Sequence, residues 1–218
     1  MNAERKIRNL IASLSVLSAL VLSVVVVSPA VAAAGTLSAD EIAGLQFMRE
    51  EEKLAHDVYL TLYQKWGLAV FNNIANSEVM HMAAVKTLLD RYGLSDPAAG
   101  NNVGEFENAD LQSLYNQLIA QGRQSLSAAL KVGAAIEEID IRDLQVRSAG
   151  TSRVDIKSVY TNLLNGSYNH LRAFVSTLQA QTGEVYQPQY LDAGTYQSII
   201  AGSTGQRGGM GGNGGRRW

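Results

Sequence analysis

Four long segments of the chain carry apolar residues at alternating spacings of three and four, and an ionisable residue interrupts each of these stripes near its middle. The stripes lie within residues 38–66, 71–92, 125–144 and 154–178. Because this spacing gathers side chains on one face of an α-helix, each segment is predicted to form a helix with one apolar face. Four such faces are buried most simply against one another, so the chain is predicted to be an all-α helical bundle.

The interrupting residues are Glu52 in the first stripe, Glu78 and His81 in the second, Glu137 in the third and His170 in the fourth. Glu78 and His81 are three residues apart, which places both on the same helix face. A carboxylate is costly to bury unless a cation neutralises it, and several buried together need a cation all the more. We therefore expect these five residues to bind a metal ion in the centre of the bundle.

The amino-acid composition narrows the metal chemistry. The chain has no cysteine and only three histidines, which excludes a disulfide scaffold, a thiolate zinc site and an iron–sulfur cluster held by cysteines. Mixed glutamate and histidine ligands favour a redox-capable first-row ion, so iron or manganese is expected, with zinc as an alternative. Since no cysteine-bound iron is available, electrons would come from another protein or from the substrate.

The number of metal ions stays open at this level. A bundle site for two ions uses one glutamate from each of two helices and a Glu-x-x-His pair from each of the other two. Glu78 and His81 form one such pair, but the residue three before His170 is Ser167. Three glutamates leave about one positive charge of two divalent ions unbalanced. One or two ions are therefore expected.

Two acidic residues near Glu137 have alternative interpretations. Glu138 competes with Glu137 for the metal, although the rotation of about 100° between successive helical residues carries Glu138 off the apolar face. Asp140 lies three residues after Glu137 and could replace the carboxylate that is missing at Ser167.

Four residues near Glu52 are also considered. His56 lies four residues after Glu52 and is either a ligand or supporting residue of the metal, or an ordinary histidine on the helix surface. Tyr59 is either a core residue or a tyrosine that hydrogen-bonds a metal ligand or carries an electron. Glu50 and Glu51 are expected to lie on a solvated face.

Four stretches of the chain resemble a known family. They are Arg49–Tyr59, Asn73–Met82, Ile136–Leu144 and Gly166–Phe174, which read REEEKLAHDVY, NIANSEVMHM, IEEIDIRDL and GSYNHLRAF. They make about residues 40–192 similar to the uncharacterised ferritin-like family called domain of unknown function 2202. The resemblance implies a ferritin-like four-helix bundle. It also implies a metal-ligating role for Glu52 with Tyr59 nearby, but no particular reaction, because the family is unassigned and its superfamily spans several chemistries.

The chain is predicted to consist of a leader, a body and a tail. Residues 1–34 combine a basic start, an apolar run and Ala-x-Ala sites, which predicts a secretory signal peptide and hence export, with an uncleaved membrane anchor as the alternative. Residues 36–192 are predicted to hold the four-helix bundle, with a long crossover that contains a short helix near 110–120 and an extended strap over 183–192. Residues 193–218 are predicted to be a Gly-rich flexible tail.

The charge balance argues against a nucleic-acid partner, since 18 Lys and Arg residues face 20 Asp and Glu residues. The predicted function is an exported ferritin-like metalloprotein; if it is an enzyme, it is an oxidoreductase that acts on peroxide, oxygen or ferrous iron. The alternative is a non-catalytic bundle of the cell envelope that binds metal for storage or structure, or binds a partner. A homo-oligomer is compatible with either function, and Arg207, Arg216 and Arg217 in the tail could attach it weakly to an anionic surface or simply be solvated.

Overall fold

The computed structural model describes residues 36–202, and within this range the chain forms six helices and no strand. The helices are α2 (Ala39–Trp66), α3 (Ala69–Tyr92), α4 (Ala109–Gly122), α5 (Leu126–Ala149), α6 (Val154–Thr182) and α7 (Ala193–Ala201). The four long predicted helices correspond to α2, α3, α5 and α6, so the all-α prediction is confirmed. The chain divides after Ala39 into a short N-terminal unit and the helical unit that holds every feature described below.

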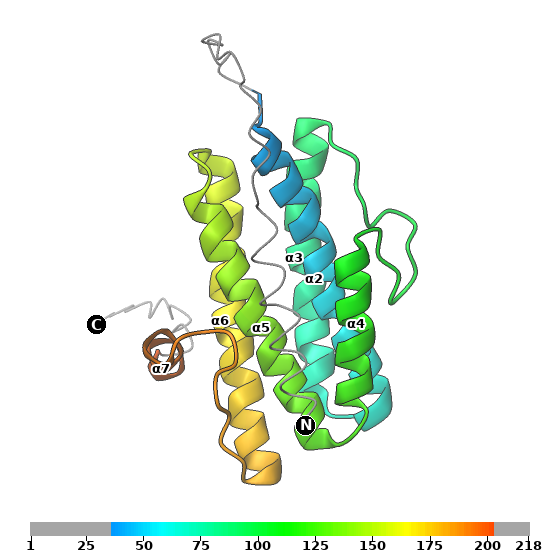
Figure 1. The fold of residues 1–218 in the computed structure, drawn as a ribbon, viewed down its shortest axis with the longest axis vertical. Coiled ribbons are helices and arrows are strands. Elements are labelled where there is room, and N and C mark those ends of the chain that lie inside the picture. Colours follow the sequence, from blue (N-terminus) through cyan, green and yellow to red (C-terminus); the bar gives the residue numbers. More distant parts are fainter. Residues whose placement is uncertain (1–35, 203–218) are drawn as a thin grey trace, which may run out of the picture. The chain divides into compact units, whose positions relative to one another are not determined.

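The four long helices lie side by side (Figure 1). Helix α5 packs along α6, α3 packs against α6, and α4 packs against α5. Only residues 67–68 join α2 to α3, whereas residues 93–125 carry the chain from α3 to α5 and include α4. Because this crossover returns to the end of the bundle where α3 began, α3 and α5 run in the same direction (Figure 1).

A glycine directly follows the last residue of both α2 and α3. Gly67 and Gly93 adopt left-handed φ angles of 66° and 65°. The N–H of Gly93 donates to the carbonyl of Asp90, which satisfies a carbonyl at the end of α3. The tight connection at Gly67 folds α3 back along α2, and this brings His81 level with Glu52.

Aromatic rings fill part of the bundle interior. The centroid of the Phe174 ring lies 5.0 Å from that of Tyr59 and 5.6 Å from that of Phe71, and all three side chains are fully buried. Such ring pairs add directional contacts to the apolar area that they bury. Tyr59 marks the boundary of this apolar region, because its hydroxyl group reaches Glu137.

The prediction of a flexible tail from residue 193 is wrong at its start, because residues 193–201 form α7. Asp192 caps this helix by accepting a hydrogen bond from the N–H of Thr195, and Tyr196 and Ile199 are buried. The tail was predicted from the glycines of residues 202–215, whereas the residues before them form a short helix with a buried side. The predicted strap over 183–192 contains no helix or strand. The predicted leader and residues 203–218 lie outside the described residues.

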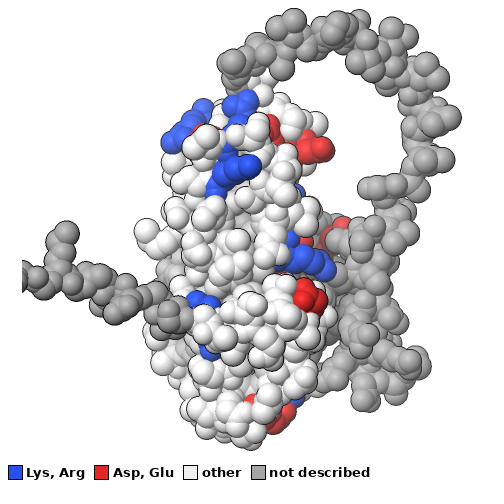
Figure 2. All heavy atoms as spheres, turned by 90° about the vertical axis from the view of Figure 1, so that its left-hand side faces the viewer, with Lys and Arg blue, Asp and Glu red and all other residues white. Residues whose placement is uncertain are grey.

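Few charged side chains lie on the face shown in Figure 2, where Lys and Arg gather mainly toward one end. Many ionisable residues are instead buried: Arg49, Glu50, Glu51, Glu52, Lys53, Asp57, Glu78, His81, Glu137, Glu138, Asp140 and His170. Buried charges require specific partners, and these partners reveal the candidate site. Between residues 36 and 202, no helix has both the length and the apolar character needed to cross a membrane.

Candidate metal centre

The fold brings the five residues that interrupt the apolar stripes together. Glu52 comes from α2, Glu78 and His81 from α3, Glu137 from α5 and His170 from α6. All five are buried, with exposed fractions between 2% and 9%. We call these five residues the Glu/His cluster.

Glu78 lies at the centre of the Glu/His cluster. Its Oε2 is 2.8 Å from Nδ1 of His81, and its Oε1 is 2.8 Å from Nδ1 of His170. On the two flanks, Oε2 of Glu52 is 3.2 Å from Nδ1 of His81, and Oε2 of Glu137 is 3.5 Å from Nδ1 of His170. Each histidine therefore presents its Nδ1 atom to two carboxylates.

Three members of the cluster offer ligand atoms close enough to share one metal ion. One atom each from Glu78, His81 and His170 lie within 4.8 Å of one another. The two imidazole rings stack, with centroids 5.4 Å apart and planes 28° apart. Imidazole nitrogen together with carboxylate oxygen suits zinc, iron and manganese.

The cluster carboxylates favour protonated histidines in the metal-free protein. Burial alone would lower the pKa of His81, but its contacts with Glu52 and Glu78 outweigh burial and raise that pKa to about 11. Burial likewise opposes protonation of His170, yet Glu137 and Glu78 raise its pKa to about 10. Burial would raise the pKa of Glu78, whereas the two histidines lower it to about 2. At neutral pH the metal-free cluster thus holds two imidazolium protons that a bound cation would displace.

Glu52 has a carboxylate oxygen that no described group satisfies. Burial raises its pKa to about 7, although His81 acts in the opposite direction, and its Oε1 is buried with no hydrogen-bond partner. Asp140 on α5 shares this condition, since its Oδ1 is buried without a partner, and burial and then Glu52 raise its pKa well above the usual range. A buried polar atom without a partner costs about 1–3 kcal/mol. A cation would satisfy these oxygens, so the residues present fit a bound metal ion.

Ser167 occupies the position where a two-ion site would have a glutamate, and it contacts Asp140. The Ser167 hydroxyl donates a 2.5 Å hydrogen bond to Oδ2 of Asp140, and both residues are buried. Ser167 lies on α6, three residues before His170, whereas Asp140 lies on α5. The structure therefore places a carboxylate from α5 beside the position on α6 that lacks one.

Tyr59 holds one oxygen of Glu137. Its hydroxyl group donates a 2.6 Å hydrogen bond to Oε1 of Glu137. Burial and the charges of Glu137 and Glu78 raise the pKa of Tyr59 well above its usual range, so the phenol keeps its proton. The contact leaves Oε2 of Glu137 on the side of His170.

Glu138 and His56 lie away from the Glu/His cluster. Oε2 of Glu138 accepts hydrogen bonds of 2.5–3.0 Å from the backbone N–H groups of residues 189–191, and so fixes the segment after α6. His56 pairs with Asp57 instead, at 2.8 Å, and 21% of its side chain is exposed. Neither residue contacts the histidines of the cluster through a described hydrogen bond or ion pair.

The expectation that Glu50 and Glu51 face solvent is wrong, because their exposed fractions are only 3% and 4%. Glu50 accepts hydrogen bonds from the backbone N–H groups of Glu107 and Asn108 in the crossover. Burial raises the pKa of Glu51 well above its usual range, and Arg147 of α5 opposes that rise. The apolar stripe of α2 marks one buried face, whereas the crossover and α5 bury two more.

Ser77 was not recognised from the sequence. Its Oγ is 2.9 Å from Nε2 of His170. Ser77 precedes Glu78 and lies four residues before His81, so its helical spacing does place it near the cluster. The spacing does not reveal a partner on α6, because that depends on how α3 and α6 are aligned.

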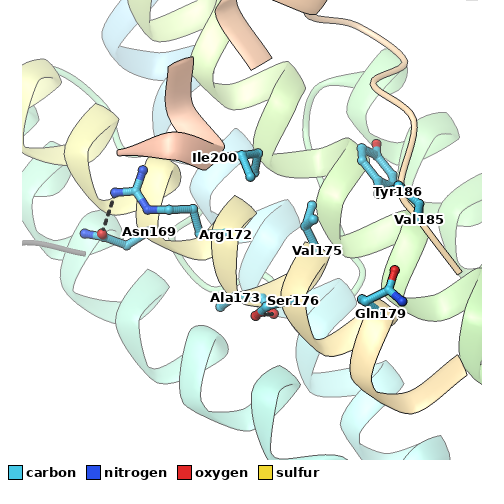
Figure 3. Close-up of a pocket in the computed structure, with 9 residues that line it drawn as sticks. All are labelled: Asn169, Arg172, Ala173, Val175, Ser176, Gln179, Val185, Tyr186 and Ile200. Atoms are coloured by element: carbon cyan, nitrogen blue, oxygen red, sulfur yellow. Dashed lines mark hydrogen bonds between the residues drawn. The ribbon is translucent and has the colours of Figure 1, made fainter. Parts of the chain in front are cut away.

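A groove on the outer side of α6 is separate from the Glu/His cluster. Its volume is about 610 Å³, and it is lined by Asn169, Arg172, Ala173, Val175, Ser176, Gln179, Val185, Tyr186 and Ile200 (Figure 3). Arg172 donates to the Asn169 side chain at one end of this groove (Figure 3). None of the five cluster residues lines it, so the groove gives no direct access to them.

Comparison with known proteins gives a consistent result. A family model described as an uncharacterized protein domain, DUF2202, matches residues 41–203. The uncharacterized protein MJ0754 of Methanocaldococcus jannaschii is 51% identical over 168 residues, which cover 77% of this chain and 90% of that protein. A crystal structure of hypothetical protein MJ0754 from Methanococcus jannaschii matches with a TM-score of 0.76 at 50% identity, over 78% of this chain and 97% of that one. The chain therefore belongs to the DUF2202 family of uncharacterized proteins.

Proposed function

We propose that this protein binds a redox-active metal ion, iron or manganese, in the Glu/His cluster. The observation that carries the proposal is the convergence of two histidine Nδ1 atoms on three buried glutamates, one of which has an oxygen without a partner. Glu78, His81 and His170 would hold the ion, and Glu52 and Glu137 would complete its ligands. One or two ions remain compatible with this set, with Asp140 as a further carboxylate nearby.

We propose that the bundle is of the ferritin-like kind. Two helical hairpins joined by a long crossover, with every long helix contributing to one polar cluster, support this assignment. The leader predicted over residues 1–34 adds the proposal that the protein is exported. The relatives found are uncharacterized, so no activity is transferred from them.

The proposed reaction class is oxidation or reduction of a small partner: peroxide, oxygen or ferrous iron. A bound iron or manganese ion would supply the change of oxidation state. The protein residues would exclude larger molecules, since none of the five is more than 9% exposed. Tyr59 would keep Glu137 oriented, and Glu52, with its unpartnered oxygen, is the carboxylate best able to change its contacts.

Metal uptake by the full-length protein tests the proposal. The purified protein is incubated anaerobically with Fe(II) or Mn(II) and desalted, and bound metal is measured by mass spectrometry. We expect the wild type and His56→Ala to retain metal, because His56 lies outside the cluster. His81→Ala should lose it, since removing a ligand weakens binding by more than the roughly 10–100-fold cost of an outer-shell change. No bound metal in the wild type, or equal content in all three proteins, would contradict the proposal.

A second assay separates catalysis from metal storage or a structural role. Metal-loaded wild type and His56→Ala should consume hydrogen peroxide at similar rates, whereas His81→Ala should not. If the wild type retains metal but consumes neither peroxide nor oxygen, and does not oxidise Fe(II), the oxidoreductase proposal fails and the non-catalytic alternative stands.

A further inference from the structure

Each histidine of the Glu/His cluster makes its second contact with the helix of the other. His170 lies on α6, and its Nε2 is 2.9 Å from Oγ of Ser77 on α3. His81 lies on α3, and its Nε2 faces Gly166 on α6, where an added Cβ would lie 2.4 Å from Nε2. Both Nε2 atoms therefore lie toward the opposite helix, while both Nδ1 atoms face carboxylates.

We propose that Ser77 and Gly166 are positioning residues that commit both histidines to bind a metal ion through Nδ1. The inference rests on the proposed function, because it concerns the same metal. The Ser77 hydroxyl accepts a hydrogen bond from Nε2–H of His170, which keeps the proton on Nε2 and leaves the lone pair of Nδ1 for the ion. Partners of this kind fix both the tautomer and the direction of a ligating ring.

Gly166 acts through the space that its missing side chain leaves. Its backbone is helical, so the glycine is needed for space and not for a left-handed conformation. A Cβ at this position would lie 2.6 Å from Cε1 of His81, closer than real Cβ atoms approach other heavy atoms. An alanine would therefore push the imidazole away from α6 and shift its Nδ1 relative to Glu78.

The two positions act crosswise, and this distinguishes positioning from general stability. Ser77 lies on the same helix as His81 but contacts His170, whereas Gly166 lies on the same helix as His170 but contacts His81. A loss of Ser77 should therefore disturb the histidine of α6, and a side chain at Gly166 should disturb the histidine of α3. A variant that merely loosened its own helix would give the opposite pattern.

The test uses the full-length protein labelled with ¹⁵N-histidine and loaded with Zn(II), a diamagnetic probe that accepts the same ligand atoms. In the wild type, ¹⁵N NMR should show a coordinated Nδ1 and a protonated Nε2 for both cluster histidines. Ser77→Ala should change the signals of His170 and leave those of His81, and Gly166→Ala should do the reverse. Each variant should weaken zinc binding by roughly 10–100-fold in titration calorimetry.

Matched controls keep the test specific. Ser77→Thr retains the hydroxyl group and should restore wild-type affinity. Ser176→Ala removes the hydroxyl group of an exposed serine on α6. Gly122→Ala places a Cβ 2.7 Å from the Leu62 side chain, which is not a member of the cluster. Both of these controls should bind zinc like the wild type.

Three results would overturn the inference: Nε2 coordination in the wild type, unchanged affinity in both variants, or the same disturbance of both histidines by either variant. If Gly166→Ala does not fold, the comparison of Ser77→Ala with Ser77→Thr decides. A wild type that binds no metal defeats the proposed function instead. The Nε2–H signal of His170 in metal-free wild type and Ser77→Ala then still shows whether the serine accepts a hydrogen bond from this nitrogen.

Discussion

Helix α2 buries charged residues on two sides, and the two sides differ in how their carboxylates are satisfied. The crossover-facing set, Arg49, Glu50, Lys53 and Asp57, contains two cations and two anions. On the other side, Glu52 joins the Glu/His cluster, in which three glutamates outnumber two histidines. Both sides are buried to a similar degree.

The crossover-facing set finds its partners within the chain. Arg49 forms a bidentate ion pair with Asp96. Lys53 forms an ion pair with Asp57 and donates a hydrogen bond to the carbonyl of Asn102. The second oxygen of Asp57 is 2.8 Å from Nδ1 of His56. Every carboxylate oxygen of this set therefore has a partner.

The contrast shows which property of a buried charge points to a metal ion. Burial alone does not, because Glu50 is as buried as Glu52 and serves only to hold the crossover. What separates them is Oε1 of Glu52, which is buried and has no partner. A carboxylate oxygen left unpaired in a residue that also contacts a histidine indicates that a further cation completes the set. Glu51 and Glu138 each have an unpaired buried oxygen as well, but neither has a described contact with a histidine.

Among single substitutions, one that breaks the crossover-facing set should have the largest effect on stability. Lys53→Ala removes the lysine beside Asp57 and leaves that buried carboxylate with only His56 and the Gly104 N–H as partners. Loss of one partner of a buried pair costs about 3–5 kcal/mol, so the free energy of unfolding in urea should fall by that amount. The loss should be the same with and without added manganese. A variant as stable as the wild type would show that this set does not hold the crossover.

The adjacent residues Glu138 and Glu137 on α5 differ in what they contact: Glu138 holds the segment after α6, whereas Glu137 faces His170. Glu138→Gln weakens three backbone hydrogen bonds to residues 189–191, and hydrogen bonds to charged groups contribute about 1.5–3 kcal/mol, so a loss of this order is expected in urea unfolding. Glu137→Gln should instead lower metal uptake and change metal-free stability less. If Glu138→Gln lowers metal uptake as much as Glu137→Gln does, the two roles are not separate.

Helical periodicity was enough to predict the long helices and the residues that meet between them. The predicted short helix near 110–120 corresponds to α4, and the fourth stripe lies within α6. When four helices pack with an ionisable residue near the middle of each buried face, those residues come together in the centre of the bundle. This is why Glu78, His81 and His170 could be named as neighbours before their distances were known.

The missed features depend on contacts that periodicity does not describe. Glu50 and Glu51 are covered by the crossover and by α5, and the crossover has no regular pattern from which its path could be inferred. Ser77 and His170 meet only because of the alignment of α3 against α6. The sequence shows that Gly166 is a glycine within a predicted helix, but it does not show that Gly166 lies against His81 on another helix. The local sequence pattern predicts the helices, whereas the alignment of the helices against one another determines which residues surround the site.

The pH dependence of stability should differ between the two sides. The folded-state pKa values of His81 and His170 are raised to about 11 and about 10. Above the ordinary histidine pKa of about 6.5, only the folded protein keeps these protons, so the free energy of unfolding falls as pH rises, by up to about 1.4 kcal/mol per pH unit for each group.

This decline should appear between about pH 6.5 and pH 10 in the metal-free protein and should disappear with metal bound, because the ion replaces the protons. The crossover-facing set behaves differently. Burial would raise the pKa of Asp57, but His56 and Lys53 lower it, so its contribution is lost only in acid. Urea unfolding across this range, with a chelator or with manganese, gives the measurement. Metal-free stability that rises with pH would contradict the assigned protonation of the histidines.

The smallest expected effect is also the sharpest comparison, because it concerns two glutamates of similar burial two residues apart. In Glu52→Gln, a neutral amide replaces a carboxylate whose charged form burial disfavours, as its pKa of about 7 indicates. At pH 8 the metal-free variant should lose less stability than Glu50→Gln, because the relief of burying the Glu52 charge offsets its lost contact with His81, while its metal uptake falls. Glu50→Gln should destabilise the protein and leave metal uptake intact, since both oxygens of Glu50 accept backbone hydrogen bonds. If Glu52→Gln destabilises the metal-free protein as Glu50→Gln does, then Glu52 is a structural residue, and its unpaired oxygen does not indicate a metal ion.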